Sequence, residues 1–247
     1  MPNIYLSPST QEKNFYVNGG TEEEWMNKLA DALEPYLTAS GIRFTRNTPE
    51  MSAASSIRAS NAGQYDLHLA LHSNAAPEGL YGQRRGIIVF YYPGSSQGQR
   101  AATLVADGLK AIYPLPNDVR AEPSTSIGEV TKPIAPSVFV ELGYHDNQDD
   151  ATWIKNNIDA AARSIALSLT EYFGLPFLTP RAYRNAVVDV NWGSLNIRDK
   201  PDTASYVVTR APDGARLTVI NQYRNWYRGL GQRRLCHLGI SQWSYTL

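Results

Sequence analysis

The chain has little of several features, and each scarcity excludes a class of protein. Its 247 residues include one cysteine, Cys236, so no disulfide can form within the chain. No segment approaches the roughly 18 consecutive apolar residues of a membrane span. Basic and acidic residues both total 23, so the whole chain lacks the basic excess that is typical of nucleic-acid-binding proteins. No groove-reading helix motif is present either, which makes a nucleic-acid-binding function a poor interpretation.

The charge that is present is unevenly distributed along the chain. From Pro176 onward there are ten basic residues and four acidic ones, and the first 175 residues carry the opposite excess. The hydrophobic content of 43% and charged content of 19% are ordinary for globular proteins. Length and composition therefore predict one large domain followed by a small basic one.

Residues 1–175 alternate short apolar runs with longer amphipathic ones, which predicts an α/β domain with a mostly parallel sheet flanked by helices. Thr21 and Glu24 form a capping box that predicts the start of the first helix, and Asp149 or Asp150 is expected to cap the last. The expected strands are Asn3–Leu6, Ile42–Arg46, Asp66–His72, Gly86–Tyr92 and Ser137–Leu142. The expected helices are Glu22–Leu37, Ala53–Ala62, Gln97–Ile112 and Ala151–Phe173.

The later part of the chain has a different residue pattern, which is typical of β structure. Pro176 and Pro180 predict a stiff linker over residues 176–184, because proline fixes φ. Residues 185–247 then read as a small all-β barrel, with brief strands separated by turn clusters. The expected strands of this barrel are Val187–Val190, Leu195–Arg198, Tyr206–Thr209 and Leu217–Ile220.

Four side chains in the first domain are candidates for chemistry. His68 and His72 are four residues apart on one predicted strand, so they point to the same face, and His72 ends that strand. Glu141 follows the apolar run VFV, where a carboxylate is costly to bury without a cation or hydrogen bonds. Glu22 shares a helical stripe with apolar residues and should point inward. Each candidate also has a purely structural interpretation. The histidines could be core residues, and Glu141 could form a salt bridge.

These residue types are the parts that a zinc hydrolase needs. Zinc is held by imidazole and carboxylate ligands and lowers the pKa of its bound water, while a separate glutamate moves the proton. The segments YDLHLALHSNA and VFVELGYHDNQDDATWI, with RNTPE, Arg58, Asn61 and GIIVFYY, resemble the zinc-dependent N-acetylmuramoyl-L-alanine amidases that cleave peptidoglycan. The resemblance covers residues 1–175. It implies that Glu22 and His72 bind zinc and that Glu141 is the catalytic residue.

The first loop departs from that family's pattern. Where the family has a histidine ligand in a DPGHGG-like loop, this chain reads SPSTQEKN, which places Thr10 at the ligand position and Gln11 next to it. Gln11 can coordinate through its amide oxygen and is a candidate third ligand, although it is weaker than imidazole. His68 is the alternative substitute.

The second domain resembles bacterial SH3-type modules that bind cell-wall material, and LNIRDKP is the specific part of that resemblance. Its positive charge suits a wall rich in anionic polymer. After Arg228 the resemblance stops, so the tail from residue 229 to 247 is atypical. We expect a frameshifted tail there and a barrel that lacks its closing strand.

Together these features predict a peptidoglycan hydrolase that cleaves the amide bond between N-acetylmuramic acid and L-alanine of the stem peptide. The start MPNIYLSPS lacks the charged and apolar regions of a signal peptide. We therefore expect an endolysin-like or autolysin-like enzyme that stays in the cytoplasm until it is released to the wall. The alternative is a non-catalytic wall-binding protein whose metal site has decayed at the first loop. The sequence does not reveal the oligomeric state.

Overall fold

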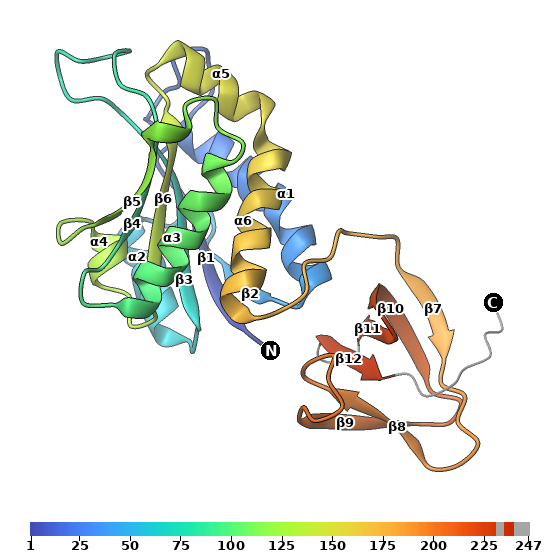
Figure 1. Ribbon diagram of the computed structural model, residues 1–247. Coiled ribbons are helices and arrows are strands. Elements are labelled where there is room, and N and C mark those ends of the chain that lie inside the picture. The colour runs from blue at the N-terminus through green and yellow to red at the C-terminus, as the bar shows by residue number, and fades with distance from the viewer. Residues whose placement is uncertain (231–234, 240–247) are drawn as a thin grey trace. The chain divides into compact units, whose positions relative to one another are not determined.

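The computed structural model describes residues 1–230 and 235–239. The chain divides into two compact units, shown in Figure 1. One comprises Pro2–Glu34 and Phe44–Gly174, and the other comprises Met1, Pro35–Arg43 and the chain from Leu175 onward. The expected domain limits, 1–175 and 185–247 with a linker between them, stay predictions. In the part of the chain that the structure describes, no helix is both long and apolar enough to span a membrane.

The first unit is built on a six-stranded sheet with the order β2-β1-β3-β6-β4-β5. Strands β1, β3 and β6 are parallel, β4 is antiparallel to β6, and β5 is parallel to β4. The sheet is therefore mostly parallel, as predicted, with two strands reversed at one edge. The strands are β1 Asn3–Pro8, β2 Arg43–Arg46, β3 Leu67–Asn74, β4 Ile87–Tyr91, β5 Val119–Pro123 and β6 Ser137–Tyr144. The edge strand β5 is absent from the expected set of about five strands, because VRAEP has no long apolar run.

Helices cover both faces of this sheet. Figure 1 shows α3 and α6 side by side in front of it and α2 behind it. Val130 of α4 packs with Ala70 and Phe139 of the two central strands. The helices are α1 Glu22–Ser40, α2 Ala53–Ala62, α3 Ser96–Lys110, α4 Gly128–Thr131, α5 Gln148–Asn156 and α6 Ile158–Phe173, and Pro116–Asp118 form a 3-10 turn.

Two details of the helices correct the sequence-based prediction. The single helix expected over Ala151–Phe173 is two helices, and the chain breaks at Asn157, whose φ and ψ are not helical. The cap of α5 is Asn147, whose side-chain oxygen accepts from the backbone N–H groups of Asp149 and Asp150. Both aspartates thus lie inside the first turn, where their charge favours the positive end of the helix dipole.

The second unit contains an antiparallel six-stranded sheet with the order β7-β10-β11-β12-β8-β9. Val188, Ile197 and Ala211 form its small buried cluster. Its strands are β7 Arg184–Val187, β8 Ser194–Arg198, β9 Val207–Pro212, β10 Arg216–Tyr223, β11 Trp226–Leu230 and β12 Leu235–Gly239. The first strand expected here, Val187–Val190, is displaced toward the N-terminus, because Arg184–Val187 pairs with β10.

The expectation that the second unit lacks a closing strand is wrong for the part that the structure describes. Strand β12 pairs with β11 on one side and with β8 on the other, so it joins the two halves of the sheet. The rest of the atypical tail, residues 231–234 and 240–247, lies outside the described residues, and the expected frameshift there stays a prediction.

Candidate functional site

The candidate site lies on one face of the three parallel strands. The parallel register places Tyr5 beside His68 and places His72 beside Glu141. Because side chains alternate along a strand, the same face presents both histidines and Glu141. The expectation that His68 and His72 share a face is confirmed by their shared partner, described below. His72 and Glu141 stand near the carboxyl ends of their strands, where open α/β sheets bind ligands.

Glu22 reaches this face from the first turn of α1. Thr21 caps the helix by accepting from the backbone N–H of Glu24 at 3.2 Å. That start places Glu22 on the inward side, where only 1% of it is exposed. Its Oε1 lies 2.7 Å from Nδ1 of His72, and its Oε2 accepts from the amide of Asn14 at 2.6 Å. Burial raises the pKa of the Glu22 carboxyl, but the hydrogen bonds from His72 and Asn14 lower the pKa by more than burial raises it. The net pKa of Glu22 is therefore below its usual value.

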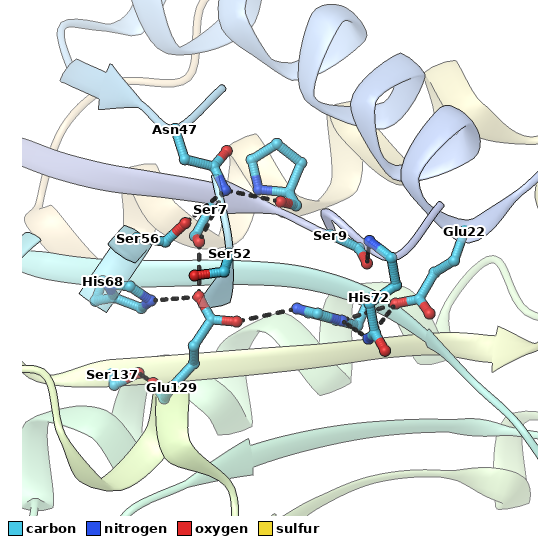
Figure 2. Close-up of polar contacts among 12 residues, drawn as sticks. Ser7, Ser9, Glu22, Asn47, Ser52, Ser56, His68, His72, Glu129 and Ser137 are labelled. Atoms are coloured by element: carbon cyan, nitrogen blue, oxygen red, sulfur yellow. Dashed lines mark hydrogen bonds and ion pairs between the residues drawn. The ribbon is translucent and has the colours of Figure 1, made fainter. Parts of the chain in front are cut away.

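The second ring nitrogen of His72 meets another carboxylate, Glu129. The distance from Nε2 to Oε2 of Glu129 is 3.2 Å. Figure 2 shows the result: His72 stands between two glutamates, and Glu129 stands between two histidines. Burial alone would lower the pKa of His72, yet the hydrogen bonds that the ring donates to both carboxylates outweigh burial and raise the pKa well above the usual range.

Glu129 is the site residue that sequence reasoning missed. It lies on the four-residue helix α4, which is too short to show a hydrophobic period, and it is far from the other site residues along the chain. Its Oε1 accepts from the hydroxyl of Ser7 at 2.6 Å and from Nε2 of His68 at 3.2 Å. Burial raises the pKa of Glu129, but its bonds to His68 and His72 dominate and lower the pKa to about 2. The only sequence signal was a glutamate beside the buried Val130.

His68 is fully buried and does not reach Glu22. Its Nδ1 lies 3.0 Å from the hydroxyl of Ser60, and its Nε2 faces Glu129. Its ring also stacks on Tyr5 with centroids 5.4 Å apart. The structure therefore places His68 beside the site, with both ring nitrogens occupied by hydrogen bonds.

Glu141 has the opposite environment. Among the residues that the structure describes, its Oε2 is buried with no hydrogen-bond partner. Burial raises the pKa of Glu141 to about 8; the charge of His72 opposes that rise, and the charge of Glu22 adds to it. A carboxyl group in this state can hold and exchange a proton near neutral pH.

Gln11 lies where the first-loop ligand was expected, but its amide nitrogen faces the site. Nε2 is 3.4 Å from Nδ1 of His72 and 3.5 Å from Oε1 of Glu22, while its oxygen accepts from Asn14. Coordination through the oxygen therefore requires the amide to turn over. That ligand role stays a prediction.

A cavity of about 770 Å³ opens beside His72. Its wall is formed by the first loop, by the start of α2 and by α4. It combines apolar side chains with a few polar ones, as small-molecule sites commonly do. Its lining includes Gln11, Glu50, Met51, Ser52, Ile57, His72, Ile127, Glu129, Lys132 and Phe139.

The described residues supply only part of a metal site. Among the described residues, no group of three or more His, Cys, Asp and Glu side chains is disposed to hold one. Two suitable donor groups nevertheless lie together, because Nδ1 of His72 and a carboxylate oxygen of Glu22 are 2.7 Å apart, joined by a proton that a metal ion would replace. Glu141 lies beside His72 in the register of the neighbouring strand, and its buried Oε2 has no partner among the described residues. Imidazole and carboxylate suit zinc, so these residues fit a zinc ion whose four positions would be completed by one further protein ligand and a water molecule.

Comparison with known families decides what this site belongs to. The family model described as N-acetylmuramoyl-L-alanine amidase matches residues 9–171. The chain belongs to the N-acetylmuramoyl-L-alanine amidase family. The matched segment contains Glu22, His72, Glu129 and Glu141, so the whole candidate site lies within the amidase domain. A search of curated proteins finds no match.

Solved structures show the same amidase fold. The amidase AmiC2 of Nostoc punctiforme is 15% identical, with a TM-score of 0.61, and covers 70% of this chain and 97% of its own. The CwlD amidase of Clostridioides difficile, solved with the GerS lipoprotein, is 13% identical, with a TM-score of 0.61 and coverage of 70% and 99%. The catalytic domain of the CD27L endolysin, which targets Clostridia difficile, is 19% identical, with a TM-score of 0.58 and coverage of 69% and 98%. These amidases share the architecture of the first unit.

Proposed function

We propose that this protein is a zinc-dependent amidase that hydrolyses peptidoglycan between the lactyl group of N-acetylmuramic acid and L-alanine of the stem peptide. Family membership supports the reaction class. The observation that carries the proposal is the pair formed by His72 Nδ1 and Glu22 Oε1 at 2.7 Å, beside the unpartnered carboxyl of Glu141.

Glu22 and His72 would hold the zinc ion, with Gln11 as a third ligand once its amide turns. A zinc ion bound there lowers the pKa of water and polarises a carbonyl group. Glu141 accepts a proton from the attacking water molecule and passes it to the leaving nitrogen of L-alanine, so the amide bond breaks and the carboxyl stays on the lactyl group. The cavity beside His72 receives the part of the substrate that flanks the scissile bond.

The test measures zinc and product on one preparation. The purified full chain should contain zinc and should release a new α-amino group of L-alanine from soluble muropeptides. Removal of zinc with a chelator should abolish the release, and added zinc should restore it. A chain that stays inactive when fully loaded with zinc would contradict the proposal.

The alternative is a non-catalytic wall-binding protein with a decayed metal site. One observation favours it, namely that the first loop presents the amide nitrogen of Gln11 to the site rather than an imidazole. In that case the full chain should bind insoluble walls without retaining zinc at micromolar concentration. The metal content of the purified protein distinguishes the two functions.

We further propose that the second unit is an SH3-like module that binds the cell wall. Its support is an excess of basic residues together with exposed aromatic rings, among them Trp192 at 89% and Tyr206 at 74% exposure. Anionic wall polymers would be attracted by this charge, and that attraction is screened beyond about 8 Å at physiological ionic strength. Wall binding should therefore weaken as salt is added. A role in lysis belongs to the same proposal.

A chain that ends at Leu175 separates the two activities. We expect it to hydrolyse soluble muropeptides about as well as the full chain, and to cleave intact walls less well because it lacks the tethering module. Circular dichroism would show whether the shortened chain is folded. If the shortened chain were folded but no longer hydrolysed muropeptides, the proposal that residues 1–175 carry hydrolysis and the second unit carries wall binding would be wrong.

A further inference from the structure

We propose that Glu129 is a positioning residue that fixes the His72 ring, through a hydrogen bond from Nε2, so that Nδ1 is presented to the metal. This inference rests on the proposed zinc site. It concerns a carboxylate that touches neither substrate nor metal and that acts through His72.

The two nitrogens of His72 face different groups, and this decides which one can bind a cation. Nε2 lies 3.2 Å from Oε2 of Glu129, and Nδ1 lies 2.7 Å from Oε1 of Glu22. A carboxylate accepts only, so Nε2 carries the proton that it donates to Glu129. Nδ1 faces a second carboxylate, Glu22, so in the metal-free ring it donates its own proton there, and a metal ion would take the place of that proton between Nδ1 and Glu22. Glu129 thus selects the metal-binding tautomer.

Glu129 is itself committed on both of its oxygens. Oε1 accepts from Ser7 at 2.6 Å and from His68 at 3.2 Å, and Oε2 accepts from His72. His68 is held in turn by Ser60. A direct bond from Glu129 to a metal would break this buried set of hydrogen bonds (Figure 2) and would leave buried donors without partners. The arrangement therefore favours a supporting role over ligation.

The backbone around Glu129 is fixed as well. The hydroxyl of Ser137 donates to the carbonyl oxygen of Glu129. Asn61 of α2 holds the segment that follows α4, because its amide donates to the carbonyl of Lys132 at 3.0 Å and accepts from the N–H of Ile134 at 2.8 Å. Four-residue helices have no stability of their own, so these bonds determine where Glu129 stands.

Phe139 provides a second constraint on the His72 ring. Its ring stacks on His72 with centroids 4.2 Å apart and an angle of 18° between the planes. Stacking fixes the plane of the imidazole, and the hydrogen bond to Glu129 fixes its rotation within that plane. Together they hold Nδ1 toward Glu22 before any metal arrives.

The test substitutes Glu129 with an isosteric amide. In Glu129→Gln, the amide oxygen is favoured at the position that accepts from both Ser7 and His68, so the NH₂ group faces Nε2 of His72 and His72 loses its acceptor. Loss of such a supporting partner lowers metal affinity by about 10–100-fold. Zinc affinity is measured on the full chain by competition with a chromophoric chelator. The visible absorption of the cobalt-substituted protein reports the ligand geometry.

A matched control is available in the same domain. Asp150 is also fully buried and accepts from Arg85, Tyr113 and backbone N–H groups, and no hydrogen bond joins it to His72. Asp150→Asn should cost stability without changing zinc affinity or the cobalt spectrum. Glu129→Gln should change both, with the circular dichroism spectrum of the folded chain retained.

Each other outcome overturns a stated part of the account. If the wild-type chain binds zinc and Glu129→Gln binds it equally tightly with the same cobalt spectrum, the positioning role is wrong and the proposed function stands. If Glu129→Gln loses zinc as completely as Glu22→Gln, Glu129 is a ligand and the positioning role is again wrong. If the wild-type chain binds no zinc, the proposed metal site is wrong, and the positioning role of Glu129 is wrong as well.

Discussion

Two carboxylates flank His72 in the same site, and their surroundings are opposite. Glu129 accepts three hydrogen bonds, and its pKa falls to about 2, whereas the buried Oε2 of Glu141 has no partner among the described residues and its pKa rises to about 8. Desolvation raises the pKa of both groups, so desolvation alone does not separate them. The number of donors aimed at each carboxylate does.

The difference in pKa indicates different roles for Glu129 and Glu141. A carboxylate that is satisfied and always charged can orient a histidine but cannot exchange protons near neutral pH. A carboxyl that titrates near neutrality can exchange them. One face of a parallel sheet thus carries a fixed charge bonded to Nε2 of His72 and a proton carrier beside His72 on the neighbouring strand.

The largest expected effect comes from removing the proton carrier. Glu141→Gln should lower turnover on soluble muropeptides by roughly 2–4 orders of magnitude, because general acid–base catalysis contributes about that much. Zinc content should stay the same, since Glu141 is not among the proposed ligands. Turnover close to that of the wild type would refute the assignment of Glu141.

Removing a ligand should release the metal instead. Glu22→Ala and His72→Ala should each lose zinc, as measured by atomic absorption after gel filtration. Glu24→Ala is the matched control, because this exposed neighbour pairs with Lys28 and belongs to the cap of α1. Its expected cost is about 1 kcal/mol of stability with zinc retained. Zinc loss in Glu24→Ala alone would mean that the other side of α1 faces the site.

The pH dependence of stability tests the unpartnered carboxyl in the metal-free chain. Burial raises the pKa of Glu141 from 4.5 to about 8, so the folded chain binds the extra proton between these values. The Glu141 carboxyl should therefore make the free energy of unfolding fall as pH rises through this window, by at most about 1.4 kcal/mol per pH unit. The raised pKa of His72 adds a further fall above the usual pKa of a histidine. Urea unfolding at pH 5.5 and pH 8 measures the total slope. Glu141→Gln should reduce this slope by the share of the carboxyl, and an equal slope in both proteins would contradict the account.

The smallest effect is expected from loosening the support of Glu129. Asn61→Ala removes two hydrogen bonds to the segment after α4 and should cost about 1 kcal/mol of stability. Zinc affinity should fall by less than in Glu129→Gln, because the carboxylate keeps its side-chain partners. If Asn61→Ala lowered zinc affinity as much as Glu129→Gln, the position of α4 as a whole, and not the Glu129 carboxylate alone, would determine zinc binding.

Local patterns predicted much of this arrangement. The helical stripe of α1 turned Glu22 inward, and the two-residue period of β3 brought His68 and His72 to one face. Both follow from the geometry of a single element. The apolar runs of the central strands likewise revealed the mostly parallel sheet.

The features that sequence reasoning missed depend on contacts between distant segments. Glu129 reaches His72 from a helix of one turn, and the side-chain partners that fix it come from β1 and β3. The break at Asn157 and the edge strand β5 are equally hidden, since neither has a hydrophobic period of useful length. The orientation of the Gln11 amide depends on Asn14, which no residue pattern reveals.

The position of a bound zinc ion tests the central claim most directly. Crystals of the full chain grown with zinc, and measured at the zinc absorption edge, would show it as an anomalous peak. The account predicts a peak in contact with Nδ1 of His72 and the carboxylate of Glu22, with Glu129 still hydrogen-bonded to Nε2. A peak between Nε2 of His72 and Glu129, or none on this face of the sheet, would contradict it.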